Sequence, residues 1–228
     1  MSNEGQKGSP DDQPPRPWRL PRIDLEHPIG GEMSEVVLGL VRRVQLPYLE
    51  QRYHATPVLA LFSLINGFIS IALMALTALV TEAPFVFPSL GPTAFLFFYT
   101  PTAATAAPRN TIVGHAVGAA VGWLSLVVFG LTHSPAAVTE GVSLSRVGAA
   151  ALSLGLTSGV MVLLRSPHPP AGATTLIVSL GLMAHLWQLG VLMLAVVLLT
   201  GQAIVINRLA GVPYPLWAPR AETPPATG

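Results

Sequence analysis

The architecture of this chain is indicated by one stretch, Ser166-Pro167-His168-Pro169-Pro170-Ala171-Gly172-Ala173-Thr174-Thr175, which lies between two long apolar segments. A second run rich in proline and glycine lies earlier, Phe87-Pro88-Ser89-Leu90-Gly91-Pro92-Thr93-Ala94. At one offset of 81 residues the two runs share a proline, a glycine and a threonine. Broken segments with polar residues, at matching positions in the two halves of an apolar protein, point to a transport site.

The composition identifies the class of protein. Of the 228 residues 51% are hydrophobic and 10% are charged, and the mean hydropathy is +0.57. Soluble domains have about 25% charged residues. Between Arg52 and Arg208 the charged residues are few, and each lies at an edge or in a loop of the apolar pattern: Glu82, Arg109, Glu140, Arg146 and Arg165. We therefore expect an all-α, polytopic membrane protein that contacts the lipid bilayer.

Four regions follow from the pattern along the chain. Residues 1–31 are rich in proline and have no apolar core, so we expect a disordered tail and no secretory signal. Residues 32–54 carry apolar side chains at helical spacing, which fits either an amphipathic helix on the membrane surface or a cytoplasmic helix packed on loops. Residues 55–208 form the transmembrane domain, and residues 209–228 an irregular tail.

Six membrane segments are expected within the transmembrane domain. About 20 helical residues cross a hydrocarbon core of roughly 30 Å. Four segments reach that length: Pro57–Val80, Asn110–Leu131, Val147–Leu164 and Leu186–Ile206. Two apolar segments are shorter and begin with proline and glycine, Pro84–Tyr99 and Pro169–Met183. Because a proline is tolerated in the first helical turn, each predicts the start of a short helix.

The arginines favour six crossings over four crossings with two re-entrant loops. Lys and Arg prefer the cytoplasmic side. Six crossings leave only Arg146 outside and place the others inside, whereas four crossings move Arg109 and Arg165 outside and Arg146 inside. Both arrangements put both termini in the cytoplasm. Six crossings also form two triplets of opposite orientation. The matched proline, glycine and threonine then indicate a 3+3 inverted repeat, unless they coincide by chance.

The run at residues 166–174, which contains His168-Pro169-Pro170, resembles the signature of the HPP family of integral membrane proteins. Supporting blocks follow the same order, Pro88–Ala94, then Pro108-Arg109-Asn110 with Gly114-His115, and the resemblance spans about residues 56–207. Pro92-Thr93 stands where the family more usually has Ala-Ser, which bears on the ligand contacts of that block. The resemblance implies four spanning helices and, because some plastid and cyanobacterial relatives are implicated in nitrite transport, nitrite as the first candidate substrate.

The residues of the two runs suggest how an anion would be bound. A helix N-terminus presents unpaired N–H groups and about half a positive charge, and so forms an anion site without a cationic side chain. Glycines would allow close approach, threonines would supply hydroxyls, and His168 could cap a helix or couple binding to a proton. The alternative is that the glycines and prolines only permit tight helix crossing. The candidates are Pro88, Gly91 and Thr93, with His168, Pro169, Pro170, Gly172 and Thr174.

Three further candidates lie just before or within the segment Asn110–Leu131: Arg109, Asn110 and His115. Ionisable residues inside spans usually face the protein interior or a water path. His115 therefore fits either a solute pathway or a neutral histidine bonded to a carbonyl. Arg109 fits either an anion-attracting mouth or a cytoplasmic anchor. Glycines at 114, 118 and 122 predict a close-packing helix face.

Several classes of function lack their residues. No Asp or Glu lies inside a predicted span, which argues against a cation carrier. The six histidines are dispersed, there is no cysteine, and the motifs of hydrolases and nucleotide-binding sites are absent. We therefore expect no enzyme, cofactor, metal or nucleic-acid partner. The hypothesis is a permease for a small inorganic anion in the cell (inner) membrane, compatible with a homo-oligomer; the alternative is a non-transporting anchor or sensor that recruits a cytoplasmic partner.

Overall fold

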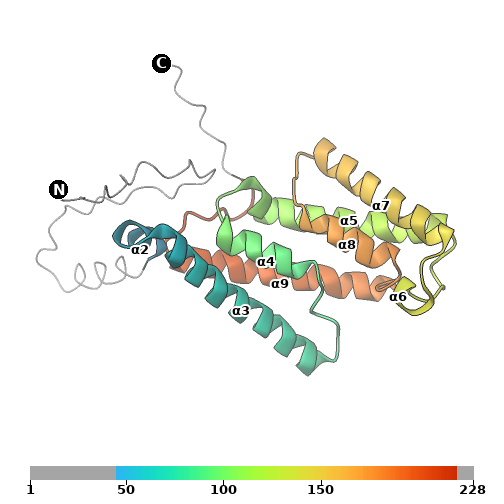
Figure 1. Cartoon of the computed structure of the whole chain (residues 1–228), viewed down its shortest axis with the longest axis horizontal. Coiled ribbons are helices and arrows are strands. Elements are labelled where there is room, and N and C mark those ends of the chain that lie inside the picture. Colours follow the sequence, from blue (N-terminus) through green and yellow to red (C-terminus); the bar gives the residue numbers. More distant parts are fainter. Residues whose placement is uncertain (1–44, 220–228) are drawn as a thin grey trace, which may run out of the picture.

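The structure, a computed structural model, describes residues 45–219, and within that range it contains helices and no strand. The predicted tail 1–31, most of the predicted helix 32–54 and the last residues of the predicted tail 209–228 lie outside the described range. The elements are α2 (Leu46–Arg52), α3 (Ala55–Thr81), α4 (Leu90–Tyr99), the 3-10 turn η2 (Ala104–Ala106), α5 (Pro108–Val128), α6 (Ala137–Glu140), α7 (Leu144–Leu163), α8 (Pro170–Ser179) and α9 (Leu186–Leu209) (Figure 1).

Four helices, α3, α5, α7 and α9, are long and apolar enough to cross a membrane, which confirms the four long segments expected from the sequence. The four helices differ in the fraction of their residues that is buried. Within the most apolar stretch of each helix, 44% of the α5 residues are buried, against 17% of the α3 residues and 22% of the α7 residues. The remaining apolar side chains, Phe68 of α3 among them, face outward, as lipid contact requires. The central helix is therefore α5, with α3 and α7 at the periphery.

The two short segments form helices of 10 residues each, α4 and α8. At 1.5 Å per residue each is about 15 Å long, half of the hydrocarbon core. Proline-containing chain without helical structure precedes both, at residues 83–89 and 164–169. Among the helices of residues 45–219 only four are long enough to qualify as spans, so the predicted count of six segments is not confirmed.

The helices alternate in direction along the long axis of the molecule. In Figure 1, α3, α5 and α8 run one way and α4, α7 and α9 the other. Hydrogen bonds at the two ends agree with this view. Near one end Asn207 of α9 donates from Nδ2 to the carbonyl of Phe97 in α4 (3.0 Å), and at the other the Ala137 amide donates to the carbonyl of Leu180 (2.9 Å).

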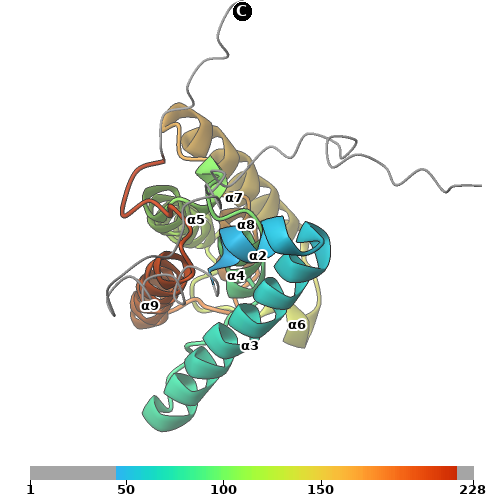
Figure 2. The same ribbon diagram turned by 90° about the vertical axis from the view of Figure 1, so that its left-hand side faces the viewer.

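The short helices occupy the interior of the bundle. Figure 2, viewed from one end, shows α4 and α8 between the four long helices. On one side α3 packs on α4 and α9, and on the other α7 packs on α8 and α5. The central contacts join α5 to α8, α4 to α9, α5 to α9 and α4 to α8. Of these two half-helices, α8 is almost wholly covered by neighbouring helices, whereas α4 keeps an exposed face that includes Phe95 and Tyr99.

The closest packing in the bundle joins α5 to α8 through glycines. A Cβ atom at Gly114 would lie 2.8 Å from the Cβ of His168, and one at Gly118 would lie 2.6 Å from the carbonyl oxygen of Ala171. At Gly122 it would lie 2.8 Å from the carbonyl oxygen of Thr175. Small residues let helix backbones approach in membranes, where packing replaces the hydrophobic effect. The predicted close-packing face is confirmed, and its partner is α8.

Arg146 has a structural role that the charge pattern could not show. Its side chain is buried at the start of α7, where Nη1 donates to the carbonyl of Ser179 (3.1 Å) at the end of α8. Nη2 donates to the carbonyls of Ser134 (3.2 Å) and Pro135 (2.7 Å). The last carbonyls of a helix have no partner within it, so a cation at that end satisfies them and opposes the helix dipole. Arg146 therefore stabilises the end of α8 and is no surface charge.

Replacing Gly118 by alanine should lower the thermal midpoint of the detergent-purified protein. The added methyl group meets a backbone oxygen that cannot move alone, and overpacking of this kind costs about 1–3 kcal/mol. Gly67→Ala in α3 is the matched control, because a Cβ there would meet nothing within 4 Å. Equal midpoints for the two variants would show that the contact between α5 and α8 is looser than described here.

Arg146→Met should also destabilise the protein, because three carbonyl oxygens lose their donor. Each buried group left without a partner costs about 1–3 kcal/mol. Arg52→Met, at an exposed position of α2, is the control. The measurement is the thermal midpoint followed by size-exclusion chromatography after heating. A midpoint for Arg146→Met within error of the control would contradict the assigned role.

Candidate functional site

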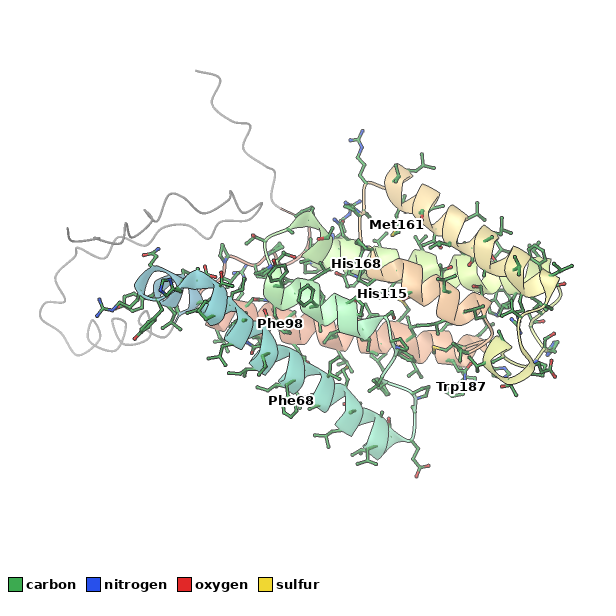
Figure 3. The ribbon with its side chains drawn as sticks, viewed as in Figure 1. Phe68, Phe98, His115, Met161, His168 and Trp187 are labelled. Atoms are coloured by element: carbon green, nitrogen blue, oxygen red, sulfur yellow. The ribbon has the colours of Figure 1, made fainter. Side chains whose placement is uncertain are left out.

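A cluster of buried polar side chains lies where the two half-helices meet α5. It consists of Thr93 from α4, Thr111 and His115 from α5, His168 from the chain before α8, and Thr174 from α8, and each is 0% exposed. We call this set the histidine cluster. Figure 3 shows His115 and His168 side by side in the interior of the bundle. Their ring centroids are 4.8 Å apart, with the rings inclined at 60°.

Four groups form a continuous chain of short contacts through the two imidazoles. Thr174 Oγ1 lies 2.7 Å from Nδ1 of His115. Nε2 of His115 lies 3.1 Å from Nε2 of His168. Nδ1 of His168 lies 2.8 Å from the carbonyl oxygen of Thr105. Every ring nitrogen of the pair therefore has a hydrogen-bond partner.

The carbonyl of Thr105 fixes the tautomers of both neutral histidines. A carbonyl only accepts, so His168 must carry its hydrogen on Nδ1 and leave Nε2 as an acceptor. His115 then donates from Nε2, and its Nδ1 accepts from the Thr174 hydroxyl. Hydrogen bonds in the neutral cluster therefore run in one direction, from Thr174 through His115 and His168 to Thr105.

Two threonines contact this chain from the side. Thr93 Oγ1 donates to the carbonyl of Ser89 (2.8 Å). It also lies 3.0 Å from Nε2 of His115, whose one hydrogen it shares with Nε2 of His168 as a second acceptor. It also lies 3.4 Å from Nε2 of His168. Thr111 Oγ1 lies 3.4 Å from Nδ1 of His168. The two matched threonines of the sequence, Thr93 and Thr174, thus reach His115 from opposite half-helices.

The turn η2 holds His168 in place through three successive carbonyls. Asn110 Nδ2 donates to the carbonyl of Ala104 (2.8 Å), and His168 Nδ1 donates to the carbonyl of Thr105 (2.8 Å). The Tyr214 hydroxyl donates to the carbonyl of Ala106 (2.5 Å). Each donor comes from a different part of the chain. Asn110 therefore supports the turn that orients His168, and does not itself join the histidine cluster.

A surface pocket of about 390 Å³ reaches His168 near the end of α7. Its lining includes Arg165, and Arg109 lies nearby, because its Nη2 donates to the carbonyl of Leu164 (3.4 Å). The other lining residues are Ser158, Met161, Val162, Pro167 and Pro169. Arg165 thus lies in the lining of this pocket and Arg109 beside it, while the side chain of His168 itself is buried behind the pocket wall.

Unpaired amide groups, which the sequence suggested as the anion donors, are not available in the first turn of α8. Pro169 and Pro170 have no N–H, the Ala171 amide donates to the carbonyl of His168 (3.0 Å), and the Gly172 amide donates to that of Pro169 (2.9 Å). At α4 the Leu90 amide donates to the carbonyl of Phe87 (3.0 Å). The expectation of an anion site built on free N–H groups is therefore wrong for α8.

Other sequence candidates lie away from the cluster. Pro88, Gly91 and Pro169 are exposed, and Pro170 is buried at the first position of α8. A Cβ at Gly91 would meet nothing within 4 Å, and one at Gly172 only a leucine side chain at 3.3 Å. Close approach of a neighbouring backbone, one of the two reasons expected for these glycines, is therefore not found; approach of a ligand stays a prediction. The glycines that permit close backbone approach are those of α5.

Sequence reasoning missed two members of the site. Thr111 precedes His115 by one helical turn, so a search for polar residues on the same helix face would have found it. Thr105 contributes only its backbone carbonyl, for which a sequence carries no signal. Across residues 45–219 no group of three or more His, Cys, Asp or Glu side chains is arranged to hold a metal ion.

Comparisons with known proteins agree with this fold. The family described as "HPP, transmembrane region" matches residues 52–215. A transmembrane protein of Dictyostelium discoideum is 33% identical over 120 residues, which is 51% of this chain and 35% of the relative. A second transmembrane protein of that organism is 32% identical over 136 residues, 57% of this chain and 44% of the relative. The chain thus spans less than half the length of either relative. No solved structure matches. Since the family match covers most of the described helices, this chain belongs to the HPP transmembrane family.

Proposed function

We propose that this protein is a permease for a small inorganic anion, and that the histidine cluster handles the solute. The observation that carries the proposal is the junction at His115, where Thr93 and Thr174 bring two proline-broken half-helices onto the two nitrogens of one imidazole. Transporters commonly place their solute sites where discontinuous helices meet inside the membrane. A pocket that reaches His168 supplies an approach from one end.

A purely structural role would not require this chemistry. Polar and ionisable groups are costly in a bilayer and usually mark a solute or proton pathway. In this protein the cost of burying polar groups falls at the centre of the bundle. Apolar side chains such as Val196 and Leu199 of α9 are fully buried without that cost. A structural bundle could place apolar residues at 115 and 168 and keep the glycine contact of α5. The two imidazoles therefore favour a functional role.

The charges around the route favour an anion. Arg165 lines the pocket and Arg109 lies beside it. The carboxylates between residues 45 and 219 are Glu50 in α2, Glu82 directly after α3, and Glu140 at the last position of α6. Fixed positive charge at a mouth raises the local concentration of anions and repels cations. Nitrite is the first candidate, on the family resemblance alone, and the protein is then a transport protein rather than an enzyme.

We further propose six membrane crossings in two inverted triplets, α3–α4–α5 and α7–α8–α9. Two features support this topology. Corresponding helices run in opposite directions in Figure 1. Exchanging α3 with α7, α4 with α8 and α5 with α9 also maps the principal set of helix contacts onto itself. The proposal places both termini in the cytoplasm and the protein in the cell (inner) membrane, as a monomer or a homo-oligomer.

Uptake into liposomes tests the proposed function. Vesicles that contain the purified protein should take up nitrite with saturation, and His168→Ala should lose most of that uptake, about tenfold or more, because it removes the acceptor that organises His115. Nitrate and formate serve as comparison anions. His133→Ala, at an exposed histidine in the loop after α5, should retain uptake.

Protein-free vesicles correct for diffusion of nitrous acid. Uptake of none of the three anions, in vesicles shown to be tight, would contradict the permease and favour the non-transporting recruiting module. Uptake lost equally in His168→Ala and His133→Ala would place the solute site elsewhere.

Accessibility offers a second test, made clean by the absence of cysteine. His168→Cys should react with a small water-soluble thiol reagent, because the pocket reaches this position, and an anion substrate should slow the reaction. Ser153→Cys should react slowly, since that hydroxyl is buried against Ser179 between α7 and α8 (3.0 Å). Equal and negligible labelling at both positions would indicate a sealed core without a solute route.

A further inference from the structure

The direction of the hydrogen-bond chain determines where an additional proton can bind. In the neutral cluster His168 carries hydrogen on Nδ1 and His115 on Nε2, and the nitrogen without hydrogen that lies at the end of the pair is Nδ1 of His115. A proton added there makes His115 a cation that donates from both nitrogens. Its Nε2 still donates to Nε2 of His168, so no other bond in the chain needs to reverse.

The added proton changes the role of Thr174. In the neutral cluster the Thr174 hydroxyl donates to Nδ1 of His115 over 2.7 Å. Once Nδ1 carries hydrogen, it donates to Thr174 Oγ1 instead, and the threonine hydrogen must turn to another acceptor. The cluster then holds one positive charge and one hydroxyl donor without its former partner. An anion would be attracted by the positive charge and would accept a hydrogen bond from the hydroxyl.

A second proton has no comparable place. It would have to bind the Nε2 of His168 that accepts from His115, so that two N–H groups would face each other over a nitrogen–nitrogen distance of 3.1 Å. Two like charges this close inside a low-dielectric bundle repel strongly. The pair must therefore titrate as one unit in its first step.

We propose that His115 and His168 bind one proton between them, and that this proton enables the cluster to bind its anion, so that one proton moves with each anion. The coupling to transport rests on the proposed function, whereas the single proton does not. In the step itself a hydronium ion gives its proton to Nδ1 of His115 and is left as water, the Thr174 hydroxyl reorients, and the anion enters. Release on the other side reverses the step and restores the neutral chain.

The groups around the pair leave the proton without a carboxylate partner. On α4 and η2 the neighbours are the neutral residues Thr93 and Thr105, and beyond η2 the Tyr214 hydroxyl is bonded to the carbonyl of Ala106. The charged groups nearest the route are Arg109 of α5 and Arg165 after α7. The remaining arginines of α7 and α9, Arg146 and Arg208, are bonded to carbonyls elsewhere. The anion is thus the counter-ion that the proton lacks.

Counting protons tests the inference without transport. A difference titration of the detergent-purified protein from about pH 3 to pH 8 spans the range in which perturbed histidines titrate. Relative to the double variant His115→Gln/His168→Gln, the wild type should bind one additional proton. Each single variant should also bind one, because the remaining imidazole no longer faces a second ring.

Independent histidines would instead give two protons for the wild type and one for each single variant, which would overturn the proposal. A wild type that binds no additional proton would also overturn it. Size-exclusion chromatography at each pH confirms that the variants remain folded. If the double variant fails to fold, the shift of each imidazole's ¹⁵N resonance with pH in the wild type and the single variants gives the same count.

Driving forces test the coupling in vesicles, with nitrite as the probe and protein-free vesicles as the correction. A 1:1 symport moves no net charge, so an inside-positive potential of about 60 mV should not drive accumulation, whereas an anion uniport would accumulate nitrite about tenfold. An acidic exterior should raise the initial rate of the wild type, and His115→Gln should lose that response. Nitrite exchange at equal pH on both sides shows whether the permease works at all.

Wild-type exchange together with potential-driven accumulation would overturn the coupling and leave the proposed function intact. Absence of exchange would contradict the proposed function and with it the coupling, but not the proton count.

Discussion

The close contact between α5 and α8 is the constraint on which the rest of the structure depends. Three glycines of α5 bring the two backbones together, and the first of them, Gly114, faces His168 directly. A side chain at that position would separate the segment before α8 from α5 and with it His168 from His115. The short helix α8 cannot span a bilayer by itself, so its position is fixed by this contact and by Arg146, which satisfies carbonyls at its end.

Because water is absent from the bilayer, the interior must satisfy its own polar groups. At one end of α8 the carbonyl of Ser179 accepts from Arg146. At the other end the carbonyl of Thr105 in η2 accepts from His168. The result is an asymmetric cluster within a near-symmetric set of helices. Each half contributes one histidine, and Thr93 and Thr174 are matched at an offset of 81 residues. At the same offset the counterparts of His115 and His168 are Val196 and Phe87, both buried and apolar.

Much of this arrangement could be predicted from the sequence, because hydropathy and proline placement act locally. They predicted the four long helices, the two short ones, and Thr93, His115, His168 and Thr174 as candidates that the fold brings together. Other features arise from packing between distant segments. From the sequence Arg146 was placed at an edge or in a loop, outside the membrane in the six-crossing arrangement, the amides of α8 were interpreted as free donors, and Gly91 was interpreted as a close-approach site. The partners of Arg146 and the contact of His168 with the carbonyl of Thr105 depend on tertiary packing that periodicity does not encode. The α8 amides are instead paired locally, to the carbonyls of His168 and Pro169.

The histidine cluster depends on the directed hydrogen bond from His115 to His168, which ¹⁵N-histidine NMR measures. Near neutral pH we expect a through-bond nitrogen–nitrogen coupling between the two Nε2 atoms, with hydrogen on Nε2 of His115 and on Nδ1 of His168. His115→Gln and His168→Gln would assign the signals and abolish the coupling. Two uncoupled imidazoles, or a His168 that carries its hydrogen on Nε2, would contradict the account.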